Sequence, residues 1–212
     1  TGVGTETRYY ADRRWGGTPP YEAYFIMRWL GGVGGTKCGG GWYDPFGTTE
    51  RTYVEQARQT VLGGARESLL FCYGALQNGT GPRNVESLRA HIPELLEVAA
   101  QVRNREPAGV AAYQPPNSHP EGEKRVYDFV GMTGVPLVPC HAFPDGAPAA
   151  FLPVHAMKDG LLGPKLTDFI KAGKPVLVTD GLAKRLEGCA DLAAPNVRTL
   201  AVGEDPVRNV RL

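Results

Sequence analysis

The sequence predicts an α/β protein whose strands run parallel. Short apolar runs bounded by turn residues alternate with longer stretches in which apolar residues recur at helical spacing. The 28 glycines and 18 prolines favour a loop-rich enzyme over a helical bundle. The alternation is interrupted at residues 103–107 (RNREP) and then starts again. We therefore expect two domains, over residues 1–104 and 105–212.

The first half of the chain contains three successive strand–helix units. The expected strands cover residues 2–5, 37–43 and 69–73, and the expected helices cover residues 21–30, 49–65 and 85–102. We expect Gly31 and Gly32 to end the first helix and Pro93 to divide the third. The continuous apolar run at 69–73 is typical of a strand buried in a parallel sheet. This pattern predicts the last three units of a (β/α) barrel, in which strand carboxyl ends hold the chemistry.

The second half repeats the rhythm with different residues. Strands are expected at 109–113, 135–140, 149–154, 175–179 and 197–202, with helices at 124–132 and 163–172. This order predicts a doubly wound parallel sheet of flavodoxin-like character, cut short at Leu212. Loops 115–118 and 179–181 fall at strand carboxyl ends, where such sheets contact small ligands.

Composition excludes several classes of function. A formal net charge of +1 without a basic block argues against nucleic-acid binding. No apolar run approaches the ~20 residues of a membrane span. The four cysteines are far apart and lack zinc-ligand spacing, so we expect no metal and no cofactor. The chain begins at Thr1 in what resembles the middle of a strand, and we expect a piece of a longer protein. The sequence leaves the cellular compartment open.

Two carboxylates stand where predicted strands give way to loops, namely Glu6 and Asp44. Retaining glycosidases need two carboxyl groups about 5–5.5 Å apart, and aromatic rings offer platforms for the apolar faces of sugars. We therefore predict a sugar site with Glu6 and Asp44 as catalytic residues. Asp44-Pro45 is equally typical of a simple turn, Glu6 can pair structurally, and large aromatic residues near glycines are also ordinary core. The side chains expected to contact substrate are Arg8, Trp42, Tyr43 and Tyr73.

Residues 53–76 (YVEQARQTVLGGARESLLFCYGAL), followed directly by a small parallel α/β domain, resemble beta-galactosidases of glycoside hydrolase family 42. The resemblance implies a retaining glycosidase with its acid/base on barrel strand four, its nucleophile on strand seven, and an amidotransferase-like second domain. Counting back from residues 69–73 as strand eight gives Asp44 the nucleophile's position, where the family has Glu. Glu6 falls one strand early, and the acid/base strand lies upstream of Thr1. We thus expect the full-length parent to hydrolyse glycosidic bonds and this piece alone to be inactive.

Two other functions remain open from the sequence. One is a non-catalytic carbohydrate-binding or oligomerisation module that forms a homo-oligomer through the second domain. The other is a Cys-dependent, amidotransferase-like hydrolase, which would use Cys140 with His141 or His155 near strand ends. Ala142-Phe143-Pro144 follows the Cys140-His141 pair in place of a glycine-flanked helix start, which disfavours this second alternative.

Overall fold

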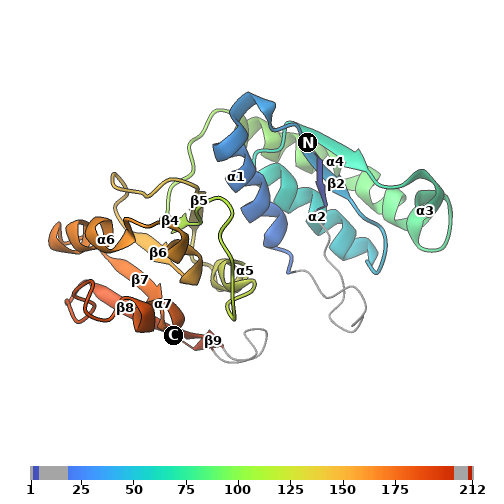
Figure 1. Ribbon diagram of the computed structural model, residues 1–212. Helices are drawn as coiled ribbons and strands as arrows, with labels where there is room; N and C mark the ends of the chain where they lie inside the picture. The colour runs from blue at the N-terminus through green and yellow to red at the C-terminus, as the bar shows by residue number, and fades with distance from the viewer. Residues whose placement is uncertain (1, 5–18, 203–209, 212) are drawn as a thin grey trace. The chain divides into compact units, whose positions relative to one another are not determined.

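The computed structural model describes residues 2–4, 19–202 and 210–211, and the chain divides into two compact units at Pro107 (Figure 1). Unit 1 covers residues 1–107 and unit 2 covers residues 108–212. Each unit is α/β with a parallel sheet, which confirms the class that the sequence predicts. Within the described residues, no helix is both long and apolar enough to span a membrane.

Unit 1 places three parallel strands in the order β1-β2-β3. Helices connect successive strands, as expected for β–α units (Figure 1). The elements are β1 (Gly2–Gly4), α1 (Glu22–Gly34), β2 (Gly40–Tyr43), α2 (Glu50–Leu62), β3 (Glu67–Leu70), α3 (Tyr73–Gln77) and α4 (Gly81–Arg103).

Helices α2 and α4 cover one face of this sheet. Helix α2 begins where the Thr49 side chain accepts a hydrogen bond from the Thr52 backbone N–H, while the Thr52 hydroxyl bonds back to the Thr49 backbone. From there its apolar side chains recur at helical spacing and meet those of α4 and β2. The buried cluster that joins them comprises Tyr43, Tyr53, Ala57, Leu88 and Leu95.

Two helix boundaries differ from the expectation. Gly31 and Gly32 do not end the first helix, because α1 continues to Gly34 and stops only at Gly35, whose φ of 51° suits a residue without a side chain. Pro93 does not divide the third helix, because α4 runs unbroken from Gly81 to Arg103. Its apolar side chains pack on both sides of Pro93, which holds the helix together despite the missing N–H donor.

Strand β3 is exposed, although the continuous apolar run predicted a buried strand. All four of its residues are exposed, and Leu69 keeps 57% of its surface accessible. Strand β3 is exposed because it is an outer strand of the three-stranded sheet and, in the described residues, pairs only with β2. Burial of an apolar strand requires neighbours on both sides, and the sequence of the strand alone does not specify them.

Unit 2 contains a larger sheet in the order β5-β4-β6-β7-β8-β9, in which only β9 is antiparallel. The predicted strands and helices of this half are present with shifts of a few residues at their ends. Helix α7 was not expected, and it begins where the Thr179 hydroxyl accepts the Leu182 N–H. The elements are β4 (Val110–Tyr113), α5 (Val126–Met132), β5 (Leu137–Cys140), β6 (Ala150–Leu152), α6 (Leu162–Lys171), β7 (Val176–Thr179), α7 (Asp180–Arg185), β8 (Val197–Val202) and β9 (Val210–Arg211).

Both faces of the unit 2 sheet are covered. Ala150 and Leu152 of β6 belong to a buried cluster with Leu166 of α6. Phe151 points to the opposite face, where its ring meets Tyr127 of α5 with centroids 5.6 Å apart. Because strand faces are buried on both sides, the accessible polar groups of such a sheet gather at the ends of its strands.

We predict that Gly40→Ala destabilises unit 1 by at least about 3 kcal/mol, because a Cβ at this position would lie 1.7 Å from the Glu67 carbonyl oxygen and force β2 away from β3. Urea unfolding followed by tryptophan fluorescence measures this change, since all three tryptophans lie in residues 1–107. Gly31→Ala is the matched control. It adds the same methyl group inside α1 with no atom within 4 Å, and should raise stability by about 0.5–1 kcal/mol. Equal unfolding midpoints for the two variants would contradict the close approach of β2 and β3.

Candidate active site

Asp44 follows β2 directly and is held by a glutamine from the covering helix. The Asp44 backbone N–H donates to Gln56 Oε1 at 3.1 Å, and Gln56 Nε2 donates to the Asp44 carbonyl at 3.0 Å. Gln56 is fully buried and Asp44 is only 3% exposed, so water cannot replace either bond. Sequence reasoning missed Gln56. Its one signal is that a polar side chain occupies the buried stripe of α2 between Tyr53 and Thr60.

The Asp44 side chain organises the loop that follows. Its Oδ1 accepts a hydrogen bond from the Phe46 backbone N–H at 2.7 Å, which is the turn that the Asp-Pro sequence also predicts. The Thr48 hydroxyl donates to the Pro45 carbonyl at 2.7 Å and accepts from Asn84 Nδ2 of α4 at 3.0 Å. The loop is therefore tied to both covering helices, and Asp44 has a fixed position at the carboxyl end of β2.

Trp42 and Phe71 lie on the other face of the sheet. Side chains alternate along a strand, so Trp42 points away from the face that Tyr43 shares with α2 and α4. The Trp42 and Phe71 rings are 6.1 Å apart at a tilt of 32°, and Leu69 is the direct partner of Trp42 in the register of β2 and β3. We call Trp42, Leu69 and Phe71 the aromatic surface. Such a surface at strand carboxyl ends suits contact with the apolar face of a sugar.

Tyr73 and Tyr43 have different environments. Tyr73 begins α3 just after the aromatic surface and keeps 79% of its surface accessible, so it is available to a ligand. The Tyr43 side chain is buried among the helices, where its hydroxyl donates to Ser68 Oγ at 2.6 Å. This placement favours a packing role over sugar contact for Tyr43.

Glu6 and Arg8 lie outside the described residues. The pairing of the Glu6 and Asp44 carboxyl groups therefore stays a prediction. Within the ranges that the structure describes, His, Cys, Asp and Glu side chains form no group of three or more that could hold a metal ion.

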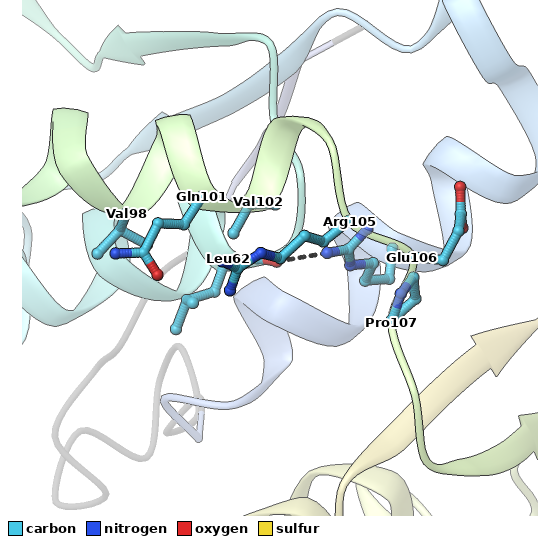
Figure 2. Close-up of a pocket in the computed structure, with 8 residues that line it drawn as sticks. Leu62, Val98, Gln101, Val102, Arg105, Glu106 and Pro107 are labelled. Carbon is cyan, nitrogen blue, oxygen red and sulfur yellow. Dashed lines mark hydrogen bonds between the residues drawn. The ribbon is translucent and has the colours of Figure 1, made fainter.

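A cavity of about 310 Å³ lies elsewhere in unit 1 (Figure 2). It is lined by the last turns of α2 and α4, including Leu62 and Val102, and by the Arg105–Pro107 segment. Arg28 also lines it and donates from Nη2 to the Leu62 carbonyl at 3.1 Å, the dashed line in Figure 2. Helix carboxyl ends in β–α units lie near the amino ends of the strands, whereas barrel chemistry occurs at the carboxyl ends. This cavity is therefore separate from the Asp44 region.

Comparison with known proteins gives one match. Residues 2–99 match the family described as "Probable glycosyl hydrolase, catalytic domain". Residues 2–99 are glycoside hydrolase-like. No curated protein and no solved structure matches the chain. The glycoside hydrolase-like segment runs from β1 into α4 and contains Asp44, Trp42 and Tyr73, and it ends before unit 2 begins.

The Cys140 region of unit 2 has the electrostatics of a buried core. Burial raises the pKa of the Cys140 thiol to about 12. The thiol donates a hydrogen bond to the Ala112 carbonyl, with 3.6 Å between Sγ and the oxygen. Burial lowers the pKa of His155 to about 4, and its ring lies beside that of Tyr127 at 5.1 Å. At neutral pH the two groups are thus a thiol and a neutral imidazole, whereas cysteine nucleophiles need a thiolate.

We predict that Gln56→Met lowers the free energy of unfolding by about 2–4 kcal/mol, because it leaves the buried Asp44 N–H and carbonyl without partners while keeping the side chain's size. Gln59→Met is the control on the same helix. The Gln59 side chain is partly exposed and, among the described residues, donates to Glu55, so a change within about 0.5 kcal/mol is expected. Urea unfolding followed by tryptophan fluorescence gives the free energy of unfolding of both variants. Equal decreases would show that the Gln56 hydrogen bonds to Asp44 do not stabilise the protein more than the Gln59 contact does.

Alkylation tests the state of Cys140. With iodoacetamide at pH 8, we expect Cys140 to react on the order of a hundredfold more slowly than the exposed Cys189, because burial keeps the Cys140 thiol protonated. Peptide mass spectrometry after timed quenching gives both rates in one sample. Preferential labelling of Cys140 would instead indicate an activated thiol and would support the alternative function as a Cys-dependent hydrolase.

Proposed function

We propose that unit 1 is the carboxyl-terminal part of a glycoside hydrolase barrel and that the full-length parent hydrolyses glycosidic bonds. The match of residues 2–99 to a glycosyl hydrolase catalytic domain carries this proposal. The three parallel strands with connecting helices support it, because they have the arrangement of consecutive barrel units. The aromatic surface at the strand carboxyl ends supports a carbohydrate as the substrate.

In this proposal Asp44 is the nucleophile and Glu6 is a second carboxylate at the sugar-facing rim. The hydrogen bonds from Gln56 support a catalytic Asp44, because a nucleophile must be held in one position to attack. Trp42 and Tyr73 would stack on sugar rings, and Arg8 would bind a sugar hydroxyl. The acid/base residue would come from the part of the barrel that precedes this sequence in the parent.

In this proposal unit 2 is the second, amidotransferase-like domain that follows the barrel in family 42-like proteins. Its strand order β5-β4-β6-β7-β8 corresponds to 2-1-3-4-5 in order of appearance, which supports a flavodoxin-like, doubly wound domain of amidotransferase-like ancestry. We propose that this domain assembles the parent into a homo-oligomer. A mass that rises with protein concentration in analytical ultracentrifugation supports this role, and a monomer at every concentration opposes it.

A non-catalytic carbohydrate-binding module is the second candidate. The observation that favours it is the burial of Asp44, whose Oδ1 is engaged by the Phe46 N–H in a turn. A carboxylate used in this way can be structural while the aromatic surface alone contacts sugar.

Asp44→Asn in the full-length parent separates the two candidates. The amide oxygen can still accept the Phe46 N–H, so the loop should persist while nucleophilic attack is lost. We expect turnover of nitrophenyl glycosides to fall on the order of a thousandfold or more. Asp145→Asn is the control, since Asp145 is exposed in unit 2 outside the glycoside hydrolase-like segment and its change should leave turnover intact.

Turnover that survives Asp44→Asn would remove Asp44 from the mechanism. If the parent shows no hydrolysis at all but binds sugars, and Trp42→Ala weakens that binding while Trp29→Ala does not, the binding module replaces the enzyme as the function.

A further inference from the structure

A second cavity lies in unit 2, outside the glycoside hydrolase-like segment. Its volume is about 380 Å³, and its walls come from the loop before α5, from Val154 two residues after β6, from α7 and from the end of β8. These segments meet at the carboxyl edge of the parallel sheet, which is where doubly wound sheets bind small ligands. We call it the edge cavity. Its polar lining comprises Glu121, Glu123, Asp180, Lys184 and Arg185.

Glu123 is a buried acid in the wall of the edge cavity. It is only 5% exposed, and its Oε2 accepts the Val154 backbone N–H at 2.8 Å. The Thr179 side chain also interacts with the Glu123 carboxyl group, while Oε1 forms no hydrogen bond of good geometry among the described residues. Gly181, which also lines the cavity, makes room for this oxygen, because a Cβ there would lie 2.2 Å from Oε1. A buried carboxyl group is costly unless it is hydrogen-bonded, and a ligand that donates a hydrogen bond would add to the bonds from Val154 and Thr179.

Acidic side chains outnumber the cations around the edge cavity by one. Arg185 forms an ion pair with Glu121, and Asp180 Oδ1 accepts the Val202 N–H at 3.1 Å. Burial raises the pKa of Glu123, and the bonds from the Val154 N–H and the Thr179 side chain oppose this rise. The wall thus combines the three carboxyl groups of Glu121, Glu123 and Asp180 with the two cations of Lys184 and Arg185. A wall of this kind offers hydrogen-bond donors and acceptors and does not attract an anion.

We propose that the edge cavity binds a small neutral molecule with several hydroxyl groups, of about the size of a monosaccharide. Hydroxyl groups both donate, to Asp180 and Glu123, and accept, from Lys184. The three acidic side chains disfavour a phosphate or another anion. The volume is at the lower end of the range of about 300–1,000 Å³ seen for ligand pockets, which is too small for a dinucleotide. The inference uses residues of unit 2 alone and does not depend on catalysis by unit 1.

Amide chemical shifts test the edge cavity in the 212-residue chain. We expect D-glucose, D-galactose or D-xylose to shift the backbone amides of Gly122, Gly181 and Val202, with saturation in the millimolar range. Two competing probes are inorganic phosphate, which is an anion, and glycine, which is a zwitterion. If no sugar moves these amides at tens of millimolar, or if phosphate or glycine moves them and the sugars do not, the proposal is wrong.

Two variants and one control connect the binding to this cavity. Lys184→Ala and Asp180→Asn should each weaken sugar binding roughly fivefold, and Asn can keep the bond from the Val202 N–H. Lys171→Ala is the matched control, because Lys171 is also an exposed lysine in the last turn of a helix, α6, but does not line the cavity. It should leave the affinity unchanged. An equal loss in Lys171→Ala, or no loss in either cavity variant, would overturn the assignment.

Discussion

Two hydrogen bonds between the Gln56 side chain and the Asp44 backbone connect the end of β2 to the helix layer of unit 1. Their atoms are buried, where a hydrogen bond is electrostatically strong and an unpaired group is costly. Thr48 and Asn84 extend the connection to α4. The position of the candidate nucleophile is therefore set by the helices behind the sheet, and Trp42 lies on the opposite face.

The two sheets differ in how their faces are covered, and the candidate sites differ accordingly. In unit 1 the helices pack on the Tyr43 face, so the opposite face presents aromatic side chains at the strand ends. In unit 2 helices cover both faces, and polar groups are concentrated at the carboxyl edge of the sheet. One chain thus combines an apolar platform suited to sugar rings with a small polar cavity suited to hydroxyl groups.

Local periodicity was sufficient to predict the elements but not the contacts between them. Helix α2 was predicted because its apolar residues recur at helical spacing, yet the same pattern does not reveal that Gln56 would bond a backbone twelve residues earlier. Burial of residues 69–73 was wrong because it depends on neighbouring strands. The 179–181 segment was expected at a strand carboxyl end, but Glu123 was missed because its partner Val154 is thirty-one residues away. The Glu6 part of the sugar site stays a prediction.

The exposed strand β3 also affects how the protein behaves in concentrated solution. Among the described residues no strand pairs with its outer edge, which leaves backbone N–H and C=O groups there for another strand, and Leu69 and Leu70 add apolar surface beside them. An edge of this kind is a template for another extended chain, which is how ordered aggregates begin. Glu67 is the one charged residue of β3 and supplies electrostatic repulsion between two such edges. Within β3, the protection against edge-to-edge pairing therefore comes from the carboxylate at the beginning of the strand.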